Sequence, residues 1–67
     1  MEKVEVYVKD TDEVACENIE LMFNRRAIPF HVEHFKDMSV KLYHAEIDGI
    51  VMQVCFELGA YRIQIDK

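Results

Sequence analysis

Two turn signals in the last third of the chain agree on a single pattern of strands. Asp48-Gly49 lies between two runs of alternating apolar and polar residues, and Asp-Gly in that setting is a strong signal for a two-residue β-hairpin. Gly59-Ala60 has the composition of a second such turn. When both registers are extended, they place the same apolar side chains on one face. The sequence therefore predicts an antiparallel three-stranded meander that runs to about Ile65.

The first half of the chain predicts a β-α-β unit. Valines alternate with other residues from Lys3 to Val8, which indicates a strand. Apolar residues recur every three or four positions from Thr11 to Ala27, and Asp10 and Glu13 have the spacing of a capping box. The next strand, Phe30 to Phe35, follows a proline that cannot continue the helix. After a helix of this length, that strand can return parallel to the first by a right-handed crossover.

The two halves together predict one α+β domain over residues 1–67, in which a single helix packs on a mixed five-stranded sheet. Five strands span about 19 Å at their usual spacing, whereas a helix with its side chains is about 10–12 Å wide. One helix then leaves apolar sheet surface uncovered, which usually marks an interaction site. The residues predicted to line an interface on one face or the other are Tyr43, Ile47, Ile50, Met52, Tyr61, Tyr7, Phe35 and Leu42.

Composition argues against a nucleic-acid partner, a membrane location and secretion. Thirteen acidic against eight basic residues give a formal charge of −5, which opposes binding to nucleic-acid phosphates. The N-terminus MEKVEVYVKD has neither the apolar core of a signal peptide nor the length of a membrane span. Two cysteines are too few for the disulfide framework of a small secreted domain. We therefore expect a cytoplasmic protein that binds neither nucleic acid nor membrane.

Residues 4–35 resemble the opening β-α-β unit of glutaredoxins and related thioredoxin-fold proteins. The resemblance is carried by the order strand, helix, then Ile28-Pro29-Phe30 leading into a strand. Counted back from that tripeptide, Cys16 stands where the family has the second cysteine of its Cys-x-x-C pair, and Glu13 stands in place of the first. The resemblance implies thiol redox activity of Cys16, with glutathione as the partner.

The two cysteines each have a structural and a functional interpretation. Cys16 belongs to the apolar stripe of the predicted helix, and a free cysteine in such a place is most often a small buried hydrophobic residue. A partly exposed thiol near the first turn of a helix would instead have a lowered pKa. Cys55 is expected on the outer sheet face, opposite Leu42. A Cys16–Cys55 disulfide is disfavoured, because it would join opposite faces of the sheet.

Three residues offer a candidate metal site. His31, Glu33 and His44 are expected to project from the outer face, and imidazole and carboxylate groups at alternate strand positions can bind a metal ion. Their spacing matches no zinc motif, and solvated histidines on a polar face are the simpler interpretation. His34 is expected to point the other way.

No complete catalytic motif is present in the sequence, so we expect a non-enzymatic interaction or regulatory protein without a cofactor. Its partner would be a second copy of itself or another protein, which it would bind through exposed sheet surface. A variant of this hypothesis is an acidic inhibitor that presents carboxylates to a basic protein. The alternative from a different class is a glutaredoxin-like redox protein that uses the single thiol of Cys16.

Overall fold

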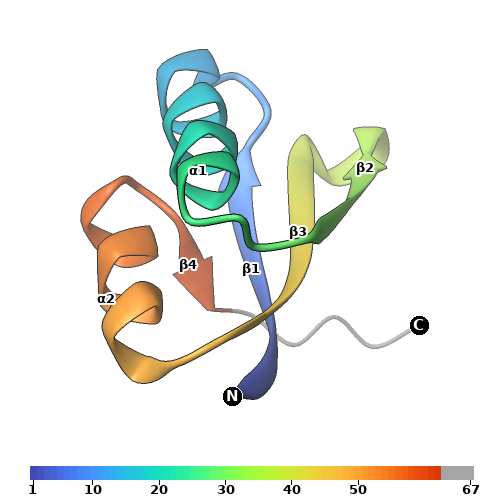
Figure 1. Ribbon diagram of the computed structural model, residues 1–67. Helices are drawn as coiled ribbons and strands as arrows, with labels where there is room; N and C mark the ends of the chain where they lie inside the picture. Colours follow the sequence, from blue (N-terminus) through green and yellow to red (C-terminus); the bar gives the residue numbers. More distant parts are fainter. Residues whose placement is uncertain (63–67) are drawn as a thin grey trace.

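The computed structural model describes residues 1–62, which form two α-helices, four strands and one short 3₁₀ helix (Figure 1). In chain order the elements are β1 (Glu2–Lys9), α1 (Glu13–Arg25), β2 (Phe30–Phe35), the 3₁₀ helix η1 (Lys36–Met38), β3 (Val40–Ile47), α2 (Gly49–Glu57) and β4 (Tyr61–Arg62).

The four strands form one sheet in the order β2-β3-β1-β4, with β2 and β4 at its edges (Figure 1). Every neighbouring pair is antiparallel. Because β3 is antiparallel to both β1 and β2, these two strands run parallel to each other with β3 inserted between them. The βαββαβ element order with this split β-α-β arrangement is the ferredoxin-like topology.

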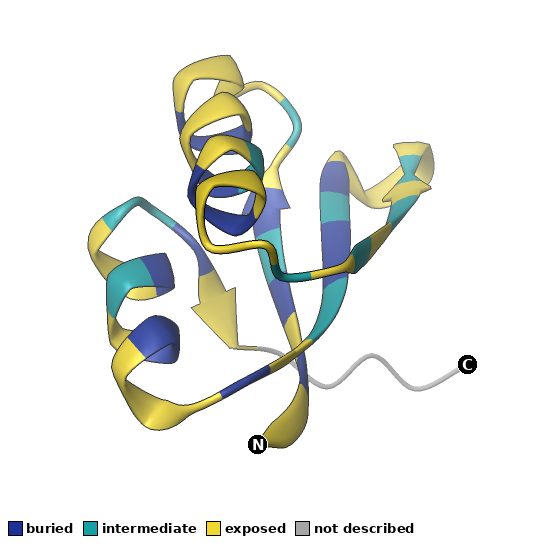
Figure 2. Cartoon of the chain, in the orientation of Figure 1, coloured by how far each residue is buried: buried dark blue, intermediate teal, exposed yellow. Residues whose placement is uncertain are grey.

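The hydrophobic core lies between the helices and one face of the sheet (Figure 2). Even-numbered valines of β1 and the odd-numbered residues Tyr43 and Ile47 of β3 supply the sheet side of the core. Both helices contribute buried side chains to the same cluster: Ala15, Cys16, Ile19, Met22 and Phe23 from α1, and Val51, Met52 and Cys55 from α2. Both helices therefore cover the same face of the sheet.

Helix α1 begins and ends with side-chain and backbone caps. The Asp12 carboxylate accepts a hydrogen bond from the Ala15 backbone N–H at 3.1 Å, so Asp12 is the N-cap, and the predicted capping box that begins at Asp10 is wrong. At the other end, the Ile28 N–H donates to the Phe23 carbonyl at 2.9 Å, and Ala27 adopts a left-handed conformation with φ 54°. This is a Schellman cap with alanine in the position that usually carries glycine.

The segment predicted as the central strand of the meander is helix α2. Asp48 caps this helix, because its carboxylate accepts a hydrogen bond from the Val51 N–H at 3.0 Å. Asp48-Gly49 therefore begins a helix and does not form a hairpin turn. The buried residues of α2 are Val51, Met52 and Cys55. Their spacing fits one side of a helix and does not fit the alternation of a strand.

Gly59 ends α2 and does not form a second hairpin turn. It has φ 104°, and the Ala60 N–H donates to the Cys55 carbonyl at 3.0 Å, which completes a second Schellman cap. The short strand β4 then pairs antiparallel with β1, so that Tyr61 lies opposite Tyr7.

The α+β class is confirmed, whereas the predicted single helix and mixed five-stranded sheet are wrong. The predicted strand over residues 30–35 has the bounds of β2, and the strand over residues 3–8 lies within β1. The continuation of the last strand to Ile65 lies outside the described residues.

Candidate functional site

The face of the sheet opposite the helices is called the open face here, because neither helix contributes to it. Strand alternation and register place eleven residues of the three longer strands on it: Lys3, Glu5, Tyr7 and Lys9 from β1, Val40, Leu42, His44 and Glu46 from β3, and His31, Glu33 and Phe35 from β2. Tyr61 of β4 joins them through its pairing with Tyr7.

A cluster of imidazole and carboxylate groups lies on the open face around His44. One ring nitrogen of His44, Nε2, lies 2.7 Å from Glu33 Oε1 on β2, and the other, Nδ1, lies 3.7 Å from Glu5 Oε1 on β1. The His31 ring lies beside His44, with ring centroids 5.5 Å apart. The four residues Glu5, His31, Glu33 and His44, called the His44 cluster below, therefore bring together side chains from three strands.

The structure brings the three metal candidates from the sequence together, because β2 and β3 are neighbours with His31 opposite His44. Their side chains are not arranged as metal ligands. Within residues 1–62, no group of three or more His, Cys, Asp or Glu side chains has positions that could hold a metal ion. Glu33 and His44 instead hydrogen-bond each other.

An aromatic pair lies beside the His44 cluster. The rings of Tyr7 and Tyr61 have centroids 5.4 Å apart and are tilted by 34°. Tyr61 is 55% exposed, Tyr7 is partly buried, and the neighbouring Leu42 is only 1% exposed. The open face thus presents the Tyr7–Tyr61 pair at its β1–β4 side and the two histidines of the His44 cluster at its β2–β3 side.

The eight residues predicted to line an interface separate into two groups. Tyr43, Ile47 and Met52 are buried in the core between the helices and the sheet, and Ile50 is exposed on α2. The other four, Tyr7, Phe35, Leu42 and Tyr61, lie on the open face. The first group reflects the misassigned meander: Ile50 and Met52 belong to α2, whereas Tyr43 and Ile47 lie on the sheet face that the two helices cover. An interface at the open face remains a prediction.

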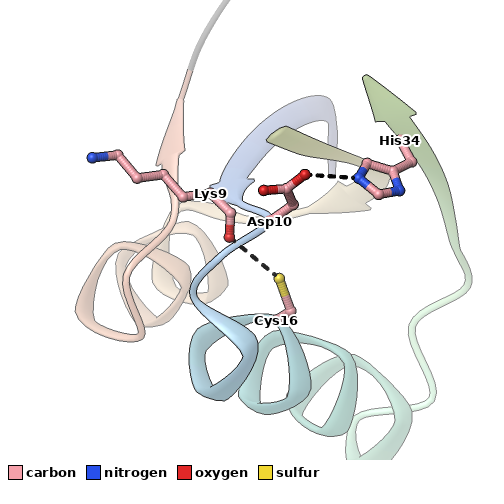
Figure 3. Close-up of polar contacts among 4 residues, drawn as sticks. All are labelled: Lys9, Asp10, Cys16 and His34. Atoms are coloured by element: carbon pink, nitrogen blue, oxygen red, sulfur yellow. Dashed lines mark hydrogen bonds and ion pairs between the residues drawn. The ribbon is translucent and has the colours of Figure 1, made fainter. Parts of the chain in front are cut away.

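Cys16, the candidate redox residue, is buried in α1 with 4% of its surface exposed. Its thiol donates to the Lys9 carbonyl, with 3.7 Å between Sγ and the oxygen (Figure 3). An adjacent shallow depression of about 420 Å³ is lined in part by Cys16, Asp10 and His34. His34 Nε2 lies 3.0 Å from Asp10 Oδ2, so that its hydrogen-bonding nitrogen is directed to a carboxylate and the thiol to a backbone carbonyl (Figure 3).

Cys55 does not lie on the outer sheet face, as the sequence predicted, but on the buried side of α2. Burial raises the pKa of its thiol above the usual 9.0. Cys16 and Cys55 are both free thiols. Both contribute to the core cluster, which fits the structural interpretation of buried cysteines.

Sequence reasoning missed three of the polar and aromatic contacts that the fold creates. It did not pair Glu5 with His44, Tyr7 with Tyr61, or His34 with Asp10, although the alternation of β1 already placed Glu5 and Tyr7 on one face. Strand order was the absent information, because each contact joins elements that are distant in sequence.

No family model, no curated protein and no solved structure matches this chain. Neither helix within residues 1–62 is long and apolar enough to cross a membrane.

Proposed function

We propose that this chain is a non-enzymatic interaction module that binds a protein partner through the open face of its sheet. The observation that carries the proposal is that both helices pack on one face, while the other presents the Tyr7–Tyr61 pair beside the His44 cluster. Tyrosines combine a large contact area with a polar tip and are enriched at protein interfaces.

The charge of the open face supports a protein partner over a nucleic acid. On this face the carboxylates Glu5, Glu33 and Glu46 outnumber the lysines Lys3 and Lys9, and the whole chain carries a formal charge of −5. Sheets that bind single-stranded RNA stack bases on aromatic side chains, but phosphates would be repelled by these carboxylates.

The same groups define the chemistry of the partner. Carboxylates pair with arginine and lysine through charge-assisted hydrogen bonds, and an arginine guanidinium also packs on a tyrosine ring. The matching surface is therefore one with basic side chains next to apolar ones. A basic protein inhibited by this acidic chain is one partner of that kind.

The redox alternative gains no support from the position of Cys16, since its thiol is buried and hydrogen-bonded to a backbone carbonyl. Reactive cysteines lie in partly exposed, electropositive surroundings. Glutathione binding is therefore not part of the proposed function. Two free thiols do fit a reducing compartment such as the cytoplasm.

Selection from a library of short displayed peptides tests the proposal. The wild-type protein is the bait, and the selected peptides are then measured against Tyr61→Ser and Glu5→Lys, which alter exposed side chains of the open face. Glu17→Lys, which makes the same charge change on exposed α1 surface, is the matched control.

We expect selected peptides to contain arginine or lysine beside apolar residues, and to lose about tenfold in affinity, or about 1.4 kcal/mol, for each open-face variant but not for the control. Amide chemical shifts of the wild-type protein should change at Lys3, Glu5 and Tyr7. Shift changes confined to the helices, or an equal loss in Glu17→Lys, would refute the proposal.

A further inference from the structure

Strand β2 is an exposed edge of the sheet. It is last in the strand order, and within residues 1–62 it pairs with β3 alone (Figure 1). Its six residues pair with β3 without interruption from Phe30 to Phe35, so the strand has no bulge. An edge strand directs a row of backbone N–H and C=O groups away from its sheet, which is a template for another strand.

β2 lacks most of the features that protect edge strands. Natural edges are blunted by lysine, by proline, by bulges or by short length. β2 contains neither lysine nor proline and is six residues long. Pro29 precedes the strand, so every residue of β2 itself has a backbone N–H group. Phe30 and Val32 also keep part of their apolar surface exposed.

We propose that β2 pairs antiparallel with β2 of a second copy, about a two-fold axis that passes beside Val32. In this register Val32 lies opposite Val32 of the second copy, and Phe30 lies opposite His34. On the open face, His31 lies opposite Glu33 of the second copy, and by symmetry Glu33 lies opposite the second His31. The interface is thus self-complementary, as a two-fold dimer requires.

Neighbouring registers lack this complementarity. A shift that places Glu33 opposite itself sets two carboxylates against each other, and like charges directly opposite are unfavourable. A shift in the other direction places His31 opposite itself and moves Glu33 opposite Pro29, beyond the end of the strand. A register shifted by a single residue would place the core face of one copy on the same side of the joined sheet as the open face of the other.

This dimer goes beyond the proposed function and does not depend on it, because it is formed by backbone pairing at the edge of the sheet. Its two pairing side chains, His31 and Glu33, also belong to the His44 cluster. Pairing at β2 joins two four-stranded sheets into one continuous sheet and leaves the Tyr7–Tyr61 side of each open face available. An interface made by one short strand from each copy is small, so we expect a dimer of micromolar affinity.

Sedimentation velocity over a range of concentrations tests dimer formation. We expect the mean mass of the wild-type protein to rise with concentration from monomer to dimer. His31→Glu, at an exposed position, places two glutamates opposite each other twice and should weaken dimerisation at least tenfold. His31→Lys places a positive charge opposite Glu33 and should dimerise at least as well as the wild-type protein.

Two controls separate pairing at β2 from a general effect of charge. Asn18→Glu and Asn18→Lys make the same net changes at an exposed position of α1, and neither should alter dimerisation. The proposal is overturned if the wild-type protein remains a monomer at every concentration. It is also overturned if His31→Glu and His31→Lys dimerise equally.

Cysteine cross-linking tests the register. Directly opposite residues of antiparallel strands have Cα atoms about 4.5–5.5 Å apart, a distance that a disulfide can span. Under mild oxidation Val32→Cys should form a disulfide-linked dimer, whereas Glu33→Cys should remain mostly monomeric. Circular dichroism checks that both variants are folded. Faster cross-linking of Glu33→Cys would overturn the proposed pairing.

Discussion

The Tyr43 hydroxyl donates a hydrogen bond to Glu20 Oε2 at 2.6 Å and joins the central strand β3 to helix α1. The Tyr43 side chain is fully buried, and its ring packs near Phe23 and Phe30. Burial, and then the hydrogen bond to the Glu20 carboxylate, raises the pKa of Tyr43 well above its usual range. This side chain, predicted from the sequence to be an interface residue, is therefore part of the core.

Removal of this hydroxyl should lower stability. Tyr43→Phe keeps the ring packing and loses a hydrogen bond to a charged acceptor, so we expect the free energy of unfolding to fall by about 1–2 kcal/mol. Glu20→Gln retains an acceptor oxygen and should cost less. Urea denaturation followed by circular dichroism measures both. An unchanged stability of Tyr43→Phe would show that the hydrogen bond contributes nothing net.

Stability should fall in alkaline solution. Burial raises the pKa of Cys55 and of Tyr43 above their usual values of 9.0 and 10.0. The unfolded chain therefore releases these protons at a pH at which the folded protein still holds them. This contribution to stability is complete below about pH 9 and is lost as the pH rises, by up to about 1.4 kcal/mol per pH unit for each group. Urea denaturation at several pH values should show a shallower decline for Tyr43→Phe than for the wild-type protein.

Glycine at the end of α1 should stabilise the protein. Ala27 has φ 54°, a conformation that costs alanine but not glycine. We expect Ala27→Gly to raise the free energy of unfolding by about 0.5–1 kcal/mol, after allowance for the greater entropy of glycine in the unfolded chain. Asn24→Gly, inside the same helix, should instead lower it by about 0.5–1 kcal/mol. Thermal denaturation of the two variants compares them, and a loss in both would contradict the assigned cap.

The two glycines should respond in opposite ways to substitution by alanine. A Cβ at Gly49, in the first turn of α2, meets nothing within 4 Å, so Gly49→Ala should stabilise by up to about 1 kcal/mol. A Cβ at Gly59 would lie 3.3 Å from the Ala15 Cβ in a backbone with φ 104°, so Gly59→Ala should destabilise by more than about 1 kcal/mol. If Asp48-Gly49 were a hairpin turn, Gly49→Ala would be destabilising instead.

Both thiols should be protected from alkylation in the folded protein. Cys16 is 4% exposed and Cys55 is fully buried, so modification should require unfolding. Cys55→Ser isolates the signal of Cys16, and Cys16→Ser isolates that of Cys55. Labelling rates that rise with urea in step with unfolding support the structural role. Rapid labelling of Cys16 in native buffer would instead revive the redox hypothesis.

The local sequence pattern was enough to predict those elements whose pattern fits a single type of secondary structure. The alternating valines of β1 and the apolar period of α1 each match one type of structure only. Asp48-Gly49 satisfies two rules at once, because aspartate is both a turn residue and a favoured helix N-cap. Packing against the sheet decided between them, because residues 50–56 are apolar at every position except Gln53 and so fit either period.

The sequence predicted which face of the sheet carries the candidate site residues, but not which of these residues contact one another. Alternation correctly placed His31, Glu33 and His44 on one side of the sheet. That β2 neighbours β3, and that Tyr61 of β4 returns beside Tyr7, depends on strand order. The sequence analysis assigned α2 as a strand. It therefore missed the helical connection that brings β4 beside β1, and the Tyr7–Tyr61 pair could not be predicted.

The position of β1 has a consequence for how the chain acquires its structure during synthesis. β1 is made first, yet its two neighbours are β3 and β4, which begin at Val40 and Tyr61. β1 therefore has no partner strand in the nascent chain until β3, Val40–Ile47, has been made. Distant pairings of this kind slow folding, because a large loop must close before any contact forms. The three longer strands can therefore pair only once Ile47 has been made, and β4 joins them only after Arg62.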